Sequence, residues 1–342
     1  MKRTLTFFST LILMGVCVYG NSPAQQKLAQ SGMKWLSVGM DSRASGMAGA
    51  MTAVEGSSAA MFYNPAGMSR QTSVIDLTAG RTMWIADIDY SYASLSVAPW
   101  EGSWGVIGVS VQSVDYGDLI GTIGSPDPTN LKQYTETGSF SPKAVMFGLG
   151  YANALSERFS IGANIKYVKQ DLGSGFLSLT STYQGANSRS YSLDVMAFDF
   201  GVLYNTGFKN LRFGMSIRNF SKEISYIQEN FQLPLTFRIG LSMNMLGIFD
   251  VDPKDQRFLL SMDAEHSRDF PEQVRVGGEY YFMDLVALRA GYITGADEEG
   301  MSLGAGAAKE YNMDGGLIGA DYAYTPFGVF GTVHRFSLHV TF

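Results

Sequence analysis

Apolar and polar side chains alternate in stretches of about ten residues from near residue 73 to the end of the chain. In the stretch that begins at Phe159, Phe159 and Ile161 share one side, and Ser160 and Asn164 share the other. Successive side chains of a β-strand point to opposite faces, so the pattern predicts strands with one apolar and one polar face. The same alternation is clear in residues 211–218, 235–244 and 273–282. A single strand of this kind fits either a membrane barrel or a soluble sandwich.

The number and length of the predicted strands favour the barrel. The alternating stretches divide into about 14 strands, each close to the ten residues that a tilted transmembrane strand needs. An even number of strands is typical of bacterial barrels and brings the two ends of the barrel sequence to the same side. The strands are expected near residues 73–83, 87–98, 103–116, 141–153, 158–171, 193–205, 210–219, 233–244, 257–266, 272–282, 285–293, 300–309, 314–324 and 331–342.

The connections between these strands alternate in length. Short turns follow the even strands, whereas the longest connections, residues 117–140, 172–192 and 220–232, follow odd strands. Short turns at one end and long loops at the other are the layout of outer-membrane barrels. Residues 245–256 are an exception, because this acidic connection is long but is expected at the short-turn end. We predict an all-β fold, a transmembrane antiparallel β-barrel of about 14 strands over residues 73–342.

The N-terminus has the layout of a secretory signal peptide. Lys2 and Arg3 precede an apolar run over residues 5–18, which is too short for a transmembrane helix, and small or polar residues follow. We expect residues 1–20 to be removed, with cleavage as late as residue 24. The alternative is a buried N-terminal helix. Cleavage removes the one cysteine, Cys17, so the mature chain is expected to have neither disulfides nor thiolate metal ligands.

Charge and composition exclude some partners and suit others. The precursor has 25 basic and 31 acidic residues, and loss of the signal brings the net charge to about −8, which argues against nucleic acid. Charged residues make up 16% of the chain and aromatic residues 13%, which suits a wall that faces lipid. The final strand ends at Phe342, and a terminal aromatic residue resembles the signal read by outer-membrane assembly machinery. We expect a Gram-negative outer membrane with its lipid as partner and both termini periplasmic.

The sequence does not indicate catalysis. His266, His334 and His339 have neither metal-ligand nor triad spacing. The many glycines lack the strand–GxGxxG–helix context of a phosphate-binding loop. The acidic residues near 250–255 and 297–299 are better explained as solvated loops than as calcium sites. We therefore expect no enzyme activity, no cofactor and no metal; a barrel-type lipase or protease is the remaining enzymatic alternative.

Residues 40–70 do not alternate and are rich in alanine and glycine. Two short helical stretches are expected there, ending at the turn that Asn64-Pro65 imposes. Such small side chains suit the lumen of a barrel better than a surface against lipid. We predict that residues 21–72 form a lead-in and a small N-terminal helical plug; a flexible periplasmic tail is the alternative, against which the low polarity argues.

The alternation also directs a set of charged side chains into the lumen. Ions in a narrow interior must pair or stay hydrated. Mixed signs on neighbouring strands therefore predict a salt-bridge network, and fixing the plug is a better explanation for it than conduction. Its predicted members are Arg212, Arg218, Arg238, Asp263, Glu265, Arg275, Glu279, Arg289 and Arg335.

Within residues 27–70 the chain reads Asp41-x-Arg43, then Gly46-Met-Ala-Gly49, and then Asn64-Pro65-Ala66-Gly67. This stretch resembles the N-terminal pattern of the PorV/PorQ family. Those proteins belong to the type IX secretion apparatus and are similar in fold to the FadL hydrocarbon transporters. Ala48 stands where the family usually has glycine, and Glu55 stands alone where an acidic pair is usual. The plug-motif residues that the resemblance implies are Asp41, Arg43, Gly46, Gly49, Asn64, Pro65 and Gly67.

The resemblance implies a secretion accessory that binds the type IX translocon or the C-terminal signal domain of its cargo. Aromatic residues anchor interfaces, so the long loops are expected to bind the partner through such side chains. The candidates are Tyr134, Phe140, Phe176, Tyr183 and Tyr191. The alternative function is a FadL-like channel for uptake or export of a hydrophobic ligand. An apolar pocket beside the plug would favour the channel, whereas a lumen closed by paired charges would count against it.

Overall fold

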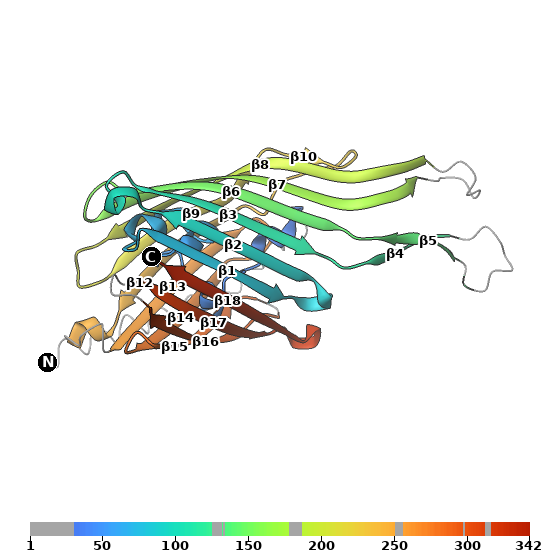
Figure 1. Ribbon diagram of the computed structural model, residues 1–342. Coiled ribbons are helices and arrows are strands. Elements are labelled where there is room, and N and C mark those ends of the chain that lie inside the picture. The colour runs from blue at the N-terminus through green and yellow to red at the C-terminus, as the bar shows by residue number, and fades with distance from the viewer. Residues whose placement is uncertain are drawn as a thin grey trace.

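The computed structural model describes residues 31–124, 132, 134–177, 187–249, 256–296, 298–311 and 316–342. Fourteen antiparallel strands close into a barrel, and β1 completes it by pairing with β18 (Figure 1). In order around the barrel these are β1 (Ile75–Met83), β2 (Asp89–Val97), β3 (Val106–Asp115), β6 (Lys143–Ala154), β7 (Phe159–Leu177), β8 (Asn187–Asn205), β9 (Arg212–Ser221), β12 (Thr236–Asn244), β13 (Gln256–Ser267), β14 (Gln273–Phe282), β15 (Val286–Thr294), β16 (Met301–Glu310), β17 (Leu317–Pro326) and β18 (Thr332–Thr341). The predicted fold class and strand number are confirmed.

The faces of the strands follow the sequence alternation. Along β7, Phe159 and Ile161 are exposed on the outer wall, whereas Ser160 and Asn164 are buried inside. An outer wall of apolar side chains is what a membrane barrel presents to lipid. None of the helices in the described ranges is long and apolar enough to cross a membrane.

The two ends of the barrel differ. One end, here called the turn end, holds the start of β1, the end of β18 and short connections such as η5 (Pro99–Gly102). Trp100 and Trp104 are exposed there, at 75% and 74%, as expected for an aromatic belt at a membrane interface. The unusually long connection after β12 is also at this end and begins with η6 (Leu246–Phe249). The opposite end, called the loop end, carries the longer connections.

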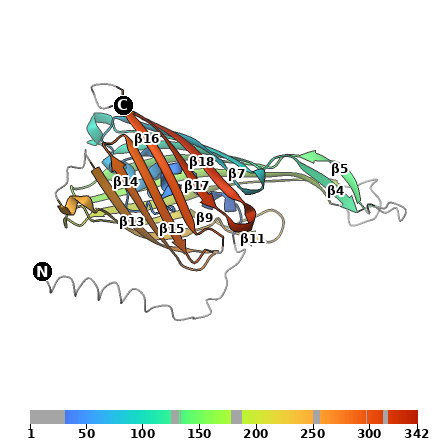
Figure 2. The ribbon, with the colours of Figure 1, turned by 90° about the horizontal axis from the view of Figure 1, so that it is seen from below.

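Two of the predicted long loops are largely β-structure, which corrects the sequence prediction. β4 (Leu119–Gly124) and β5 (Tyr134–Phe140) form one hairpin, and β7 and β8 continue as a second to Leu177 and Asn187. The third connection contains the short pair β10 (Ile224–Ser225) and β11 (Asn230–Phe231). Glycine and polar residues interrupt the apolar residues of these segments, as in β4, which reads Leu-Ile-Gly-Thr-Ile-Gly, so no long apolar stripe marks them as strands. Figures 1 and 2 show the β4–β5 and β7–β8 ribbons projecting beyond the barrel.

A belt of charges crosses the outer wall at the base of these ribbons. Arg81 forms an ion pair with Asp89 at 2.7 Å, and Lys143 lies opposite Asp115 on one side and Asp171 on the other. Charged side chains on a barrel's outer face mark the limit of the hydrocarbon layer. The ribbons therefore extend past the hydrophobic region of the membrane.

The plug segment crosses the lumen from the loop end to the turn end. Ser31 forms a bridge with Gln232 beside β11, and Ser31 and Lys34 both contact Asp269 in the β13–β14 connection. The helices that follow are η1 (Lys34–Ser37), α2 (Ser42–Gly46), η2 (Ser58–Phe62) and η3 (Pro65–Arg70). Residues 40–70 thus hold three short helices rather than two, after which the chain enters β1 at the turn end.

The predicted position of the chain ends needs one qualification. The start of β1 and the end of β18 do lie at the same end, as the even strand number requires. However, the lead-in runs through the lumen, so Ser31 lies at the opposite end from Phe342. The expected signal peptide and cleavage sites lie outside the described residues.

Candidate functional site

Glycines on the inner wall let the plug pack directly against the barrel backbone. A Cβ atom added to any of them would come within 3.1 Å of a plug atom, so a larger side chain needs space that the plug occupies. At Gly214 the obstructing atoms belong to Thr52 and Ala53, and at Gly162 they belong to Pro65 and Ala66. This glycine belt consists of Gly108, Gly150, Gly162, Gly201, Gly214, Gly240, Gly277, Gly291 and Gly304. The wall and the plug are thus matched in shape on nine of the fourteen strands.

Two carboxylates on the inner wall hold α2 in place through arginines. Arg43 donates two hydrogen bonds of 2.7 Å to Glu279, which is completely buried. Arg289 bonds the same carboxylate at 2.7 Å and Asp321 at 2.6 Å. His339 lies 3.1 Å from the other oxygen of Asp321. The alternation of β17 and β18 places Asp321 and His339 inside the barrel, although neither is among the predicted members of the network.

A second ion group joins the wall to the left-handed turn at Gly49. Glu265 lies between Arg238, at 2.9 Å, and Arg275, at 2.5 Å. The same two guanidiniums donate to plug carbonyls, Arg238 to Gly49 at 3.0 Å and Arg275 to Ala48 at 3.1 Å. Gly49 has a φ of +73°, a conformation that favours glycine. Each arginine thus neutralises a carboxylate and satisfies a buried carbonyl.

The remaining predicted lumen charges also reach the plug. Asp263 accepts hydrogen bonds from the amide and hydroxyl of Thr52, at 3.0 and 2.7 Å. Arg212 forms an ion pair with Glu55 at 2.5 Å, near the turn end. Arg218 donates to the carbonyl of Phe62, and Arg335 donates to that of Gly39 at 2.9 Å. The structure therefore places all nine predicted side chains in the lumen, where each is bonded to the plug, to another wall charge or to both.

The plug motif itself is held by caps and close contacts. Asp41 caps α2 by accepting from the amide of Ala44 at 2.8 Å and accepts a second hydrogen bond from Tyr92. Burial raises the pKa of the Asp41 carboxyl, and the Ala44 hydrogen bond opposes that shift. Asn64 caps η3 and donates to the carbonyls of Thr52, at 2.6 Å, and Val202, at 3.0 Å. Two further motif positions complete this corner: Pro65 lies at the first turn of η3, and a Cβ atom added to Gly67 would come within 3.0 Å of Val54 and Ala60.

A buried group on β7, β8 and β9 was not part of the predicted network. Lys166 forms an ion pair with Asp199 at 2.7 Å, and the amide of Asn219 donates to the same carboxylate. Asn219 has a φ of +61° and lies where the β8–β9 register shifts, so a bulge turns both Arg218 and Asn219 inward. Lys166 lies on the polar face of its strand, and that signal was visible in the sequence.

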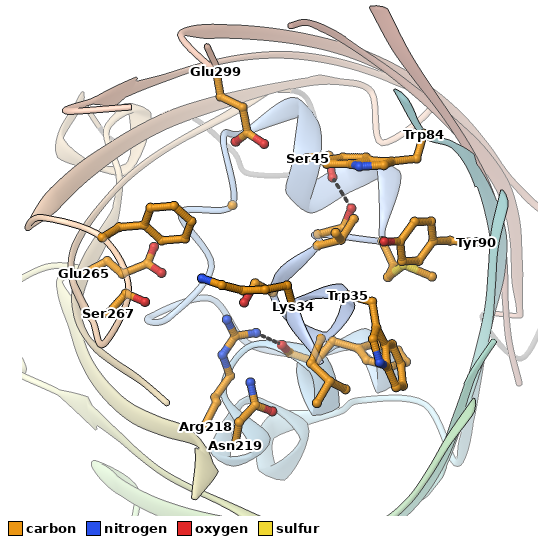
Figure 3. A pocket seen from close by; sticks show the side chains of 18 of the residues that line it. Lys34, Trp35, Ser45, Trp84, Tyr90, Arg218, Asn219, Glu265, Ser267 and Glu299 are labelled. Atoms are coloured by element: carbon orange, nitrogen blue, oxygen red, sulfur yellow. Dashed lines mark hydrogen bonds between the residues drawn. The ribbon is translucent and has the colours of Figure 1, made fainter. Parts of the chain in front are cut away.

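A cavity of about 950 Å³ lies between the plug and the loop end. Its lining residues come from the lead-in, the plug and the loop-end half of the wall, so the plug forms its floor. One side carries aromatic rings such as Trp35, Trp84 and Tyr90, whereas Arg218 and Glu265 lie on the other side (Figure 3). The cavity therefore has an apolar and a charged side.

The candidate partner-binding residues lie on the two ribbons rather than in loops. Tyr134 and Phe140 belong to β5, whereas Phe176 belongs to β7 and Tyr191 to β8. Tyr134 is exposed, and Phe140 and Tyr191 are partly exposed. Tyr183 lies outside the described residues.

Comparison with known protein families identifies the family of this chain. The family described as type IX secretion system membrane protein PorP/SprF matches residues 133–337, which is more than half of the chain and runs from just before β5 into β18. The chain belongs to the PorP/SprF family. Its barrel fold and this membership place it in the outer membrane, as predicted. A search of curated proteins gave no match.

Solved structures share the PorP/SprF chain's fold at low sequence identity. The CymD monoaromatic hydrocarbon channel superposes with a TM-score of 0.56 and 13% identity, covering 89% of this chain and 98% of CymD. The toluene transporter TbuX of Ralstonia pickettii has a TM-score of 0.56 and 12% identity, covering 88% and 97%. A FadL homologue of Pseudomonas aeruginosa has a TM-score of 0.55 and 13% identity, covering 89% and 98%. These likenesses establish a FadL-like barrel, and no more than the fold follows from them.

Proposed function

We propose that this protein is an accessory barrel of type IX secretion that binds a translocon or cargo protein at its loop end and does not conduct cargo itself. The observation that carries the proposal is the fixed plug. Its backbone packs on the glycine belt, and its arginine and its carbonyls are bonded to wall charges such as Glu279 and Arg275. Removing one member of a buried ion pair costs about 3–5 kcal/mol, so withdrawal of the whole plug is strongly opposed.

The two ribbons supply the docking surface in this proposal. Among the described strands, β4 and β5 pair only with each other, and β7 pairs only with β8 beyond Asp171. Within the described residues their outer backbone edges carry no further strand, which is the arrangement that a strand from a partner protein extends. Exposed Tyr134 adds an aromatic contact of the kind that anchors protein interfaces.

Shortening the ribbons tests this proposal. Replacing residues 172–191 with an Asn-Gly turn keeps Asp171 opposite Ser192 and so leaves the barrel register of β7 and β8 intact. A second variant shortens residues 119–140 in the same way and serves as the matched comparison. We expect at least one variant to lose co-purification of type IX components while its barrel stays folded. Undiminished recovery of those components with both ribbons removed would exclude the loop end as the docking surface.

The finer assignment and the orientation are part of the same proposal. A PorV/PorQ-like member is supported by the motif in residues 27–70, which lies outside the matched residues 133–337. An orientation with the turn end in the periplasm places Phe342 there and the ribbons outside the cell. This orientation brings the ribbons to the side where secreted cargo emerges.

A hydrophobic channel is the second candidate function. The cavity above the plug and its aromatic side favour it, as does the fold shared with a toluene transporter. Uptake of radiolabelled toluene by cells that express the protein tests this candidate. Uptake above that of cells lacking it would favour the channel, and uptake equal to that background would exclude it for this substrate.

A further inference from the structure

Several buried polar atoms around the lumen cavity have no hydrogen-bond partner among the described residues, and all of them can donate. Apart from Nζ of Lys34, which forms an ion pair with Asp269, they are Nε1 of Trp35, the hydroxyl of Tyr63, and the Nε atoms of Arg218 and Arg238. Their residues are between 3% and 8% exposed. The carbonyl and carboxylate oxygens without partners in the described chain belong to Asn164, Asp263 and Asp269, none of which lines this cavity. Burying donors without acceptors is costly, so the cavity favours a molecule that supplies acceptors.

Two arginines that line the same cavity have no ion-pair partner among the described residues, although the carboxylates of Glu298 and Glu299 also line it. Within the described residues, Arg43, Arg212, Arg238, Arg275 and Arg289 each have a carboxylate within ion-pair distance. The cavity-lining residues Arg218 and Arg335 have none in those ranges and bond only neutral oxygens, including the carbonyls of Phe62 and Gly39. Figure 3 shows Arg218 pointing toward the middle of the cavity, with Glu299 on the opposite side. An anionic group beside Arg218 would neutralise a buried cation.

The rest of the lining suits an apolar body. Trp35, Trp84, Tyr90 and Tyr116 line the cavity together with Phe231. The volume of about 950 Å³ is within the range of small-molecule sites. Aromatic rings next to a few polar donors are the usual composition of such a site.

We infer that the lumen cavity binds an acidic amphiphile, a molecule with a carboxylate or phosphate head and an apolar body. The head binds Arg218 and the neighbouring donors, and the body packs against the aromatic side. The plug closes the cavity floor, so the ligand enters from the loop end. This site does not depend on the proposed secretion role, which is tested on the ribbons.

The chain offers its own fluorescent reporters for a binding test. Of its four tryptophans, Trp35 and Trp84 line the cavity, whereas Trp100 and Trp104 are exposed at the turn end. The double variant W100F/W104F, held in lipid nanodiscs, is titrated with dodecanoate, dodecyl phosphate and uncharged dodecanol. We expect saturable emission changes with at least one acid at about tenfold lower concentration than with dodecanol, as expected for a hydrogen bond to a charged group. Whichever acid binds more tightly identifies the head group. Equal binding of the alcohol and both acids, or no saturable change, would overturn the inference.

A matched pair of variants assigns the effect to the cavity. Arg218→Gln should remove most of the preference for the acid while dodecanol binding persists, which shows that the cavity is intact. Arg212→Gln is the control, because Arg212 pairs with Glu55 and does not line the cavity. Arg335→Gln is the second test variant, should the first fail to assemble. If the test variants keep the preference for the acid to the same extent as the control, the assignment is wrong.

Discussion

Gly46 of the plug and Gly304 of β16 are in backbone contact: a Cβ atom added to either one would lie 3.1 Å from the Cα of the other. A helix that meets a strand at this distance leaves no space for a side chain on either. The same relationship, repeated around the wall, makes the plug a structural part of the barrel. Substitutions at single positions can measure how much each contact between plug and wall contributes to the stability of the protein.

Gly214→Val should displace the plug. The new side chain would overlap the backbone of Thr52 and Ala53, and overpacking of this kind costs about 1–3 kcal/mol. We expect a lower unfolding temperature in heat-modifiability gels and faster proteolysis within residues 31–72. Gly124→Val is the control, because nothing lies within 4 Å of its added Cβ. Equal behaviour of the two variants would show that the belt does not position the plug.

Glu279→Gln should destabilise the protein more than any single exposed charge change. The substitution leaves Arg43 and Arg289 without their shared carboxylate in the interior, a loss of about 3–5 kcal/mol for a buried pair. Urea unfolding followed by tryptophan fluorescence measures the difference. Glu272→Gln, at an exposed ion pair with His266, should change the midpoint little. A small effect of Glu279→Gln would show that water replaces the ion pairs.

Asn64→Ala should loosen the plug while the barrel stays closed. It removes the η3 cap and two hydrogen bonds, to Thr52 and Val202, worth about 1 kcal/mol each. Amide exchange in residues 58–70 should accelerate, whereas exchange in β14–β18 should not. Asn205→Ala, at a turn-end connection where Asn205 accepts from Gly207, is the control and should leave both regions unchanged. Uniform acceleration over the barrel would contradict a local role.

Single cysteines can report the proposed orientation, because the mature chain is expected to have none. Val329→Cys, at a loop-end position that is 87% exposed, should react with a membrane-impermeant maleimide on intact cells. Lys209→Cys, at the turn end, should react only after lysis. The unmodified protein is the control and should remain unlabelled if Cys17 is removed with the signal. Labelling of Lys209→Cys alone on intact cells would invert the orientation.

The barrel could be predicted from the sequence because each of its strands has one apolar face and one polar face. Each predicted strand overlaps one observed strand, since lipid outside and polar groups inside impose the alternation. The ribbon segments could not be recognised, because both of their faces meet water and only backbone pairing defines them. β4 and the distal part of β8 therefore looked like loops.

The contacts inside the lumen could be predicted from the sequence only in part. Alternation indicated which charges point inward, including Glu279 and Arg289, but not their partners, which depend on how the plug lies against the wall. Asp321 and His339 satisfied the same criterion and were overlooked. The cavity donors could not be inferred at all, because Trp35 and Arg218 are far apart in the sequence and meet only across the folded lumen.

The path of the lead-in limits how the plug can leave the barrel. Ser31 is fastened beside Gln232 and Asp269 at one mouth, and the same segment continues covalently into β1 at the other. The segment can therefore leave the interior only when the non-covalent contacts at Ser31 break, because its other end is part of the chain that forms the wall. The mouth farthest from β1 is thus where the plug is held by its N-terminal end.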